Sequence, residues 1–191
     1  VHRDVEVCQA QWHSAPTHVF QNYQAQVRFM VKMRFLLGLA RKIAETNGII
    51  GIPPVVATLG QLAAQACMIE GLVKGMEASG RQLGPYFVPD TRLLYSAQVL
   101  SQQLYPEVVH TIRDLAGGGM IMVPSSVADF MNPEIAGYIE KTQKSPVADS
   151  EERVKLFKLA WDAVGSEFGS RQAQYEMFYS GGPFVTRGRS F

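Results

Sequence analysis

The sequence predicts an all-α protein built as a four-helix bundle. Two observations support this class. Apolar residues recur every three or four positions over most of the chain, and the segments with this pattern are separated by short stretches rich in Pro and Gly. Such segments bury their apolar faces by packing helix on helix. The 191 residues include 47% hydrophobic side chains, enough for a sizeable core, so we expect neither disorder nor a small disulfide-stabilised fold.

The charge balance excludes some classes of partner. Eighteen basic and 17 acidic side chains leave a formal net charge of +1, which argues against a strongly basic nucleic-acid binder. There is no run of about 18 uninterrupted apolar residues and no signal-peptide pattern at the N-terminus, so we expect a cytoplasmic protein without a membrane partner. Cys8 and Cys67 lie far apart without CxxC spacing, which predicts buried thiols and no zinc or redox site.

The first long helix is predicted over about 15–47. Ser14 and Pro16 are typical of a helix start, and Asn47 with Gly48 is typical of a helix end. Apolar residues between these signals recur at helical spacing: Phe20, Tyr23, Val27, Met30, Val31, Phe35 and Leu39.

A second helix is predicted after the Pro53-Pro54 pair, ending at Gly80. Its apolar positions step by four and three residues in turn, which is the spacing of a helix that packs along another at a shallow angle. These positions, here named the 55–76 seam, are Val55, Leu59, Leu62, Ala66, Ile69, Val73 and Met76.

A third helix is predicted after a loop at 84–89. Asp90 is placed to cap this helix, and its apolar series runs to Leu115, where three glycines at 117–119 end it. Pro106 lies inside the series, so we expect a kink or a local break in front of it.

The C-terminal part contains two further helix starts. Asn132 followed by Pro133 is typical of a short helix, and Asp149 begins a capping-box-like start for the last long helix. We expect that last helix to run unbroken as far as Tyr179. The remaining residues, 181–191, are expected to form an extended tail.

Two histidine-containing patterns are candidates for metal or acid-base sites. Glu107 and His110 have the spacing of half a di-iron site, but the sequence has four His and no second pair, so no metal site is predicted. His13 and His18 flank the start of the first helix beside Trp12, at a separation unsuited to two metal ligands on one helix face. A His there suits a general base near neutral pH, although a structural role is the simpler interpretation.

Two glycine-containing segments are candidates for ligand binding. The glycines at 117–119 would let backbone N–H groups approach a phosphate, although glycines after a helix ordinarily form its cap. In Gly165-Ser166-Glu167-Phe168-Gly169-Ser170-Arg171, two glycines each cost a helix about 1 kcal/mol relative to Ala. Either they admit a crossing helix, or they expose backbone and polar side chains to a ligand such as phosphate. Both interpretations remain open.

These two segments, with Ala44-Glu45-Thr46-Asn47-Gly48 and Tyr175-Glu176-Met177-Phe178-Tyr179, resemble the C-terminal part of the 4-hydroxyphenylacetate 3-hydroxylase oxygenases, especially the chlorophenol monooxygenase branch. The resemblance covers essentially the whole chain. Since this family is built like the acyl-CoA dehydrogenases, it implies a C-terminal helical bundle at 14–180, with residues 1–13 as the end of a middle β domain. The chain is therefore expected to be part of a longer polypeptide.

The resemblance also implies an activity. Such enzymes take reduced FAD from a separate flavin reductase and let it react with O2, and the C4a-hydroperoxyflavin hydroxylates a phenol, in some cases expelling halide. The family assembles as homotetramers, each a dimer of dimers. Since the N-terminal and β domains would supply most contacts to flavin and phenol, the resemblance implies that this chain alone is inactive.

By the same resemblance, the flavin-facing residues are Gly165, Ser166, Glu167 and Phe168, with Arg171 as a phosphate contact and Gly117 and Gly118 approaching the dinucleotide. His13 is the candidate base on the substrate side, and His2 and His18 are weaker alternatives. The competing hypothesis is a non-catalytic bundle that dimerises or binds a partner through the 55–76 seam.

Overall fold

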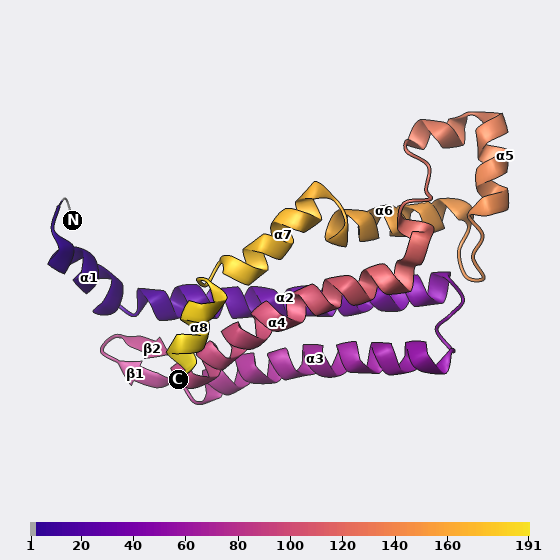
Figure 1. Ribbon diagram of the computed structural model, residues 1–191. Helices are drawn as coiled ribbons and strands as arrows, with labels where there is room; N and C mark the ends of the chain where they lie inside the picture. Colours follow the sequence, from indigo (N-terminus) through magenta and orange to yellow (C-terminus); the bar gives the residue numbers. More distant parts are fainter. Residues whose placement is uncertain (1–2) are drawn as a thin grey trace. The chain divides into compact units, whose positions relative to one another are not determined.

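The computed structural model describes residues 3–191, and nearly all of its regular structure is helical (Figure 1). The predicted all-α class is confirmed. The described residues group into two compact units: unit 1 comprises 3–33, 65–105 and 175–191, and unit 2 comprises 34–64 and 106–174. The assignment of 14–180 to a single domain stays a prediction.

The first long helix, α2 (Thr17–Thr46), agrees with its prediction, but a separate helix, α1 (Val5–His13), precedes it. Residues 5–13 are therefore helical and contain no end of a strand, whereas their assignment to a middle β domain stays a prediction. Asp4 explains the helix start, because its carboxylate accepts a hydrogen bond from the Val7 N–H at 3.0 Å. Ser14, predicted to begin α2, instead ends α1, with its N–H donating to the Ala10 carbonyl.

Helix α3 (Pro53–Ala78) buries most of the predicted 55–76 seam. The seam residues that are at most 7% exposed are Leu62, Ala66, Ile69, Val73 and Met76. The seam therefore belongs to the protein's own core and offers no free surface for dimerisation, so that part of the competing hypothesis is wrong. In the described part of the chain, α3 is also the one helix long and apolar enough to cross a membrane, judged by length and composition only.

A short hairpin replaces most of the predicted loop at 84–89. Strands β1 (Arg81–Leu83) and β2 (Tyr86–Val88) pair antiparallel, with Arg81 opposite Val88. Aromatic and β-branched residues favour a strand, and Val88 anchors it because its side chain is buried against α2, α3 and α4 in the core of unit 1.

Helix α4 (Thr91–Ala116) starts as predicted, because Asp90 Oδ1 accepts from the N–H of Arg92 at 2.8 Å and of Leu93 at 3.3 Å. The helix continues through Pro106, so a local break does not occur there, and the alternative, a kink, stays a prediction. Three short elements follow: η1 (Gly117–Met120), η2 (Val127–Met131) and α5 (Pro133–Thr142), and Asn132 caps α5 as predicted.

The last long helix is two helices, which corrects the expectation of an unbroken one. Helix α6 (Ser150–Val164) starts at its predicted cap, Asp149, and α7 (Glu167–Phe178) follows after a break at Gly165 and Ser166.

The expected extended tail is also wrong, because residues 183–190 form helix α8 (Pro183–Ser190). Pro183 suits the first position of a helix. The buried Thr186 hydroxyl donates to Gln102 Oε1 at 2.6 Å, and Gln102 Nε2 donates to the carbonyls of Met177 and Gly181 at 2.8 and 2.9 Å. One amide of α4 thus holds the C-terminal segment at three points.

A buried carboxylate ties α7 to α2 within unit 1. The Glu176 side chain is 3% exposed and accepts from Arg28 Nη1 at 2.6 Å, from Arg28 Nη2 at 3.2 Å and from Lys32 Nζ. The Arg28 guanidinium also lies over the Tyr175 ring, 4.3 Å from its centroid. Burial, together with the Glu176 charge, raises the pKa of Tyr105 to about 12.

Replacing Tyr105 with Phe is expected to remove one late step from the alkaline titration of the tyrosines. The pKa of Tyr105 in the folded protein is raised from its ordinary value of 10.0. The protonated Tyr105 therefore contributes fully to folding stability below pH 10.0, and this contribution is lost as the pH rises through about 12. Ultraviolet absorbance of tyrosinate measures this step. The step of Tyr23, whose pKa a hydrogen bond to Glu77 raises to about 12, should remain in the variant. An unchanged late titration in Tyr105→Phe would contradict the expectation.

Candidate functional site

The break between α6 and α7 holds the first predicted site segment. The N–H groups of Gly165 and Ser166 both donate to the Trp161 carbonyl, at 2.7 and 2.8 Å, which closes the C-terminal turn of α6. A Cβ at position 165 would overlap the indole of Trp161, 2.7 Å from Cζ3, and one at Gly169 would lie 3.0 Å from the Ala163 carbonyl oxygen. Both glycines are therefore required by the close approach of the chain at this corner.

Ser166 caps α7. Its hydroxyl accepts from the Gly169 N–H at 3.1 Å and donates to the Asp162 carbonyl at 3.0 Å. Glu167 and Phe168 are the first two residues of α7, so their N–H groups have no carbonyl one turn earlier in that helix to bond. Free N–H groups at a helix start carry partial positive charge and bind anions such as phosphate.

Two predicted side chains flank these N–H groups. Arg171 lies one turn into α7 and donates to Glu167 Oε1 at 2.8 Å, with both side chains largely exposed. Phe168 is 61% exposed. The first turn of α7 thus presents backbone donors, a guanidinium and an aromatic ring to solvent, a donor set that suits the phosphates and the ring system of a dinucleotide.

The glycines at 117–119 pack against the same helix, α6. Gly117 has a φ of +55°, which favours glycine, and a Cβ at Gly119 would lie 2.7 Å from the Phe157 ring. Gly118 is less constrained, since its nearest contact would be Met122 Sδ at 3.7 Å. Packing therefore accounts for Gly119, and backbone conformation for Gly117.

Three hydrogen-bonding residues of this region carry no clear functional signal in the sequence. Arg113, in the last turn of α4, donates through Nε to the Val164 carbonyl at 2.8 Å, next to Gly165. Arg153 donates to Asn47 Oδ1 at 3.0 Å, and Asn47 Nδ2 donates to the Leu115 carbonyl at 3.1 Å. In the sequence, Arg113 is recognisable only as a basic residue near a helix end, and Asn47 only as part of a signal that ends a helix.

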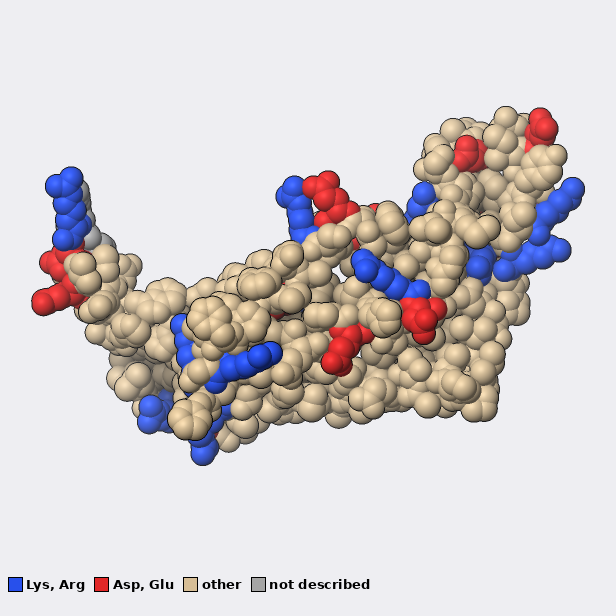
Figure 2. Space-filling view, viewed as in Figure 1, with Lys and Arg blue, Asp and Glu red and all other residues tan. Residues whose placement is uncertain are grey.

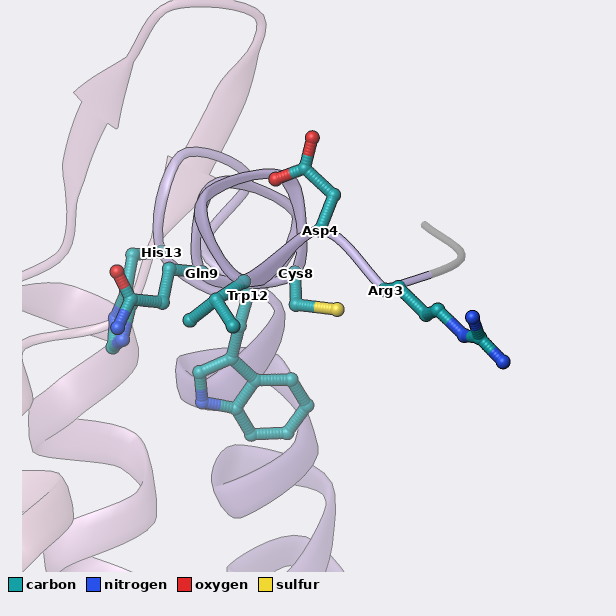
Figure 3. Close-up of a pocket in the computed structure, with 7 residues that line it drawn as sticks. Arg3, Asp4, Cys8, Gln9, Trp12 and His13 are labelled. Atoms are coloured by element: carbon teal, nitrogen blue, oxygen red, sulfur yellow. The ribbon is translucent and has the colours of Figure 1, made fainter.

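His13 lies at the end of α1 in unit 1, whereas both glycine segments belong to unit 2. Figure 3 shows His13 on the wall of a cavity of about 350 Å³. The cavity is lined by residues of α1 and by the two residues before it. The ring of His13 packs edge-on against that of His18, with 5.6 Å between centroids. Its role as a base stays a prediction, and the alternative His2 lies outside the described residues.

The remaining polar candidates are solvent-facing. Glu107 and His110 are both exposed on α4, and no group of three metal-binding side chains occurs among residues 3–191. The two thiols are exposed, not buried as predicted, because Cys8 lies on α1, which buries no side chain, and Cys67 on the outer face of α3.

Comparison with known proteins assigns the family. The sequence pattern described as "4-hydroxyphenylacetate 3-hydroxylase C terminal" matches residues 8–191. The chain belongs to this family. The oxygenase component of 4-hydroxyphenylacetate 3-monooxygenase from Pseudomonas aeruginosa is 32% identical over 183 residues, covering 95% of this chain and 35% of that protein. The same component from Escherichia coli is 37% identical, over 83% of this chain and 31% of that protein.

A solved structure confirms the fold. The crystal structure of the oxygenase component of 4-hydroxyphenylacetate 3-monooxygenase, complexed with FAD and 4-hydroxyphenylacetate, superposes with a TM-score of 0.91 at 27% identity. The match covers 97% of this chain and 39% of that one. The chain thus spans about a third of the length of its relatives in this family.

Gly165→Ala is expected to destabilise the protein by about 1–3 kcal/mol, because the added methyl group would force the Trp161 ring out of place. Thermal unfolding measures the change. Gly38→Ala, inside α2 with no atom near the new methyl group, is the matched control and should be neutral or stabilising by about 0.5–1 kcal/mol. Equal melting temperatures for the two variants would show that packing does not require Gly165.

Proposed function

We propose that this chain is the FAD-binding C-terminal part of the oxygenase component of a two-component aromatic monooxygenase. The observation that carries this proposal is the likeness, over 97% of the chain, to an oxygenase component complexed with FAD. The donor set at the first turn of α7 supports it, because N–H groups at a helix start and an exposed guanidinium are groups that bind phosphate oxygens.

In this proposal the chain's own residues bind and orient the flavin. The N–H groups of Glu167 and Phe168, at the start of α7, and the guanidinium of Arg171 hold phosphate oxygens, and Gly118 leaves room for close approach of the dinucleotide. Reduced FAD together with O2 supplies the oxidising power when bound. The apolar packing of Trp161 and Phe157 behind the two glycine segments keeps the site rigid.

The proposed substrate is a phenol, and the proposed partner is a separate reductase that supplies reduced FAD. Relatives named oxygenase components, including one that acts on 4-nitrophenol, support both. Oxygen transfer is easier onto a phenolate than onto a phenol, so a base is useful, and we propose that His13 holds the phenol proton at a ring nitrogen. The same proposal includes expulsion of halide when the phenol is halogenated. It also includes a cytoplasmic location, where reductase and oxygenase share flavin.

Arg171→Ala is expected to weaken FAD binding about tenfold, the loss typical of one charge-assisted hydrogen bond. The melting temperature should not change, because the Arg171 side chain is largely exposed and its ion pair with Glu167 contributes little to stability. Flavin fluorescence on titration measures the affinity. Arg189→Ala, exposed on α8, is the control and should bind FAD like the wild type. Equal FAD affinity in all three proteins would contradict the proposed phosphate contact.

We also propose that the protein self-associates, as a homotetramer, through the outer face of α3. This face is exposed and consists mainly of small and apolar residues: Val56, Ala57, Gly60, Ala64, Cys67, Met68 and Gly71. Figure 2 has a broad uncharged area over most of α3. No atom lies within 4 Å of a Cβ built at Gly60 or Gly71. Glycine weakens a helix, so its use on an open face favours close contact with another helix.

Ala64→Glu is expected to lower the molar mass of the assembly measured by light scattering after gel filtration, because it would place a charge in the proposed interface. Val147→Glu, at another exposed apolar position, is the matched control and should assemble like the wild type. A wild-type protein that is monomeric at micromolar concentration, or an Ala64→Glu variant with unchanged mass, would refute the α3 interface.

A further inference from the structure

The core of unit 1 contains three side-chain amides whose polar atoms the protein itself does not satisfy. Asn22 and Gln26 on α2 are each 2% exposed, and Gln98 on α4 is 0% exposed. Asn22 Oδ1, Gln26 Oε1 and both Oε1 and Nε2 of Gln98 are buried and make no hydrogen bond within residues 3–191. Because buried polar groups in folded proteins nearly always have a partner, these four atoms require one.

Helices α2 and α4 run in the same direction within unit 1. Near the start of both helices, Val19 and Leu94 belong to one apolar cluster of the core. Further along, the rings of Phe29 and Tyr105 meet edge-on, with 6.2 Å between their centroids. The contact between the two helices thus continues from the first pair to the second.

The three amides lie between these two contacts. Asn22 lies seven residues before Phe29 on α2, and Gln98 lies equally far before Tyr105 on α4. Seven residues make almost two helical turns, so each amide faces the same side of its helix as the ring that follows it. Gln26 shares that side, because it lies one turn after Asn22. The three amides are therefore neighbours on facing sides of α2 and α4.

The position of the four atoms limits what can satisfy them. They are closed off from the surface of unit 1, so neither a second copy of the chain nor another protein can reach them. The partner must be small enough to be enclosed when unit 1 folds. It must also both donate and accept, because a cation would suit the amide oxygens but not the N–H groups of Gln98. Water meets both conditions.

The residues beside the amides are small. Ala25 and Ala97, next in sequence to Gln26 and Gln98, are buried, and so is Ser101, one turn after Gln98. The Ser101 hydroxyl donates to the main-chain carbonyl of Gln98 at 2.9 Å, and so serves the backbone and not the side-chain amide. A buried place with several polar atoms and small neighbours is typical of those that hold ordered water.

We propose that unit 1 encloses a water-binding site in which water bridges Asn22, Gln26 and Gln98. The water donates to the amide oxygens and accepts from Nε2 of Gln98, which joins groups that do not bond to one another directly. These bonds are directional and lie between two apolar contacts, so they fix the register of α2 against α4. The proposal is independent of the proposed function, since it involves no flavin.

The direct test observes the water in the 191-residue chain. Nuclear Overhauser effects are expected between water and the side-chain amide protons of Gln98, because an enclosed water stays long enough to transfer magnetisation. A crystal structure that resolves ordered water should show one within hydrogen-bond distance of both Gln98 and an amide of α2. Absence of the Overhauser effects, or a crystal structure in which the three amides bond directly to one another, would overturn the proposal.

A second test uses stability. Gln98→Met removes the amide at nearly constant volume and is expected to lower the melting temperature by about 2–4 °C, because the water loses a partner and the remaining amides lose a bridge. Gln103→Met, exposed on the same helix, is the matched control and should melt like the wild type. A melting temperature of Gln98→Met that rises or stays unchanged would mean that this amide is unsatisfied in the folded protein, which contradicts the bridge.

Discussion

The carbonyl groups at the ends of the long helices need hydrogen-bond donors, and in unit 2 three side chains provide them. Asn47 donates to the end of α4, Arg113 to the end of α6, and Arg153 reaches both the Thr46 carbonyl at the end of α2 and the Asn47 side chain. These contacts join α2, α4 and α6 at their termini, where orphaned carbonyls would otherwise be buried at a cost. Every candidate ligand-binding feature of unit 2 is built on α6 or begins where it ends, so its position depends on this set of bonds.

Local signals were sufficient for much of the fold. Asp90, Asn132 and Asp149 each cap the helix that the sequence assigns to them, because a cap acts within three residues of itself. Long-range contacts explain the errors. Helix α8 depends on a bond from Thr186 to Gln102, 84 positions earlier in the chain, and the break at Gly165 depends on where the Trp161 ring packs. Neither contact leaves a periodic pattern in the sequence.

The candidate site was predictable as a segment but not as a set of functional groups. The sequence left two interpretations of Gly165 and Gly169, close packing or exposure of the backbone to a ligand. The structure of the corner between α6 and α7 shows that packing explains both glycines and that Ser166 caps α7. What remains for a ligand is the backbone of Glu167 and Phe168 with the Arg171 guanidinium. Every residue type except proline has a backbone N–H group, so residue identity does not reveal which of these groups can bind a ligand. For this reason the sequence pointed to the glycines as ligand contacts, whereas the structure points to the neighbouring Glu167 and Phe168.

The three hydrogen bonds of Gln102 have a consequence for biosynthesis. The ribosome makes Gln102 well before it makes Met177, Gly181 and Thr186, so during synthesis this amide has none of the partners that satisfy it in the finished protein. A buried amide without partners is costly, which means that this part of α4 remains hydrated until the C-terminal segment arrives. Packing around Gln102 in unit 1 thus waits for the synthesis of residues 177–186, and a molecule that lacks them exposes a polar surface that the folded protein buries.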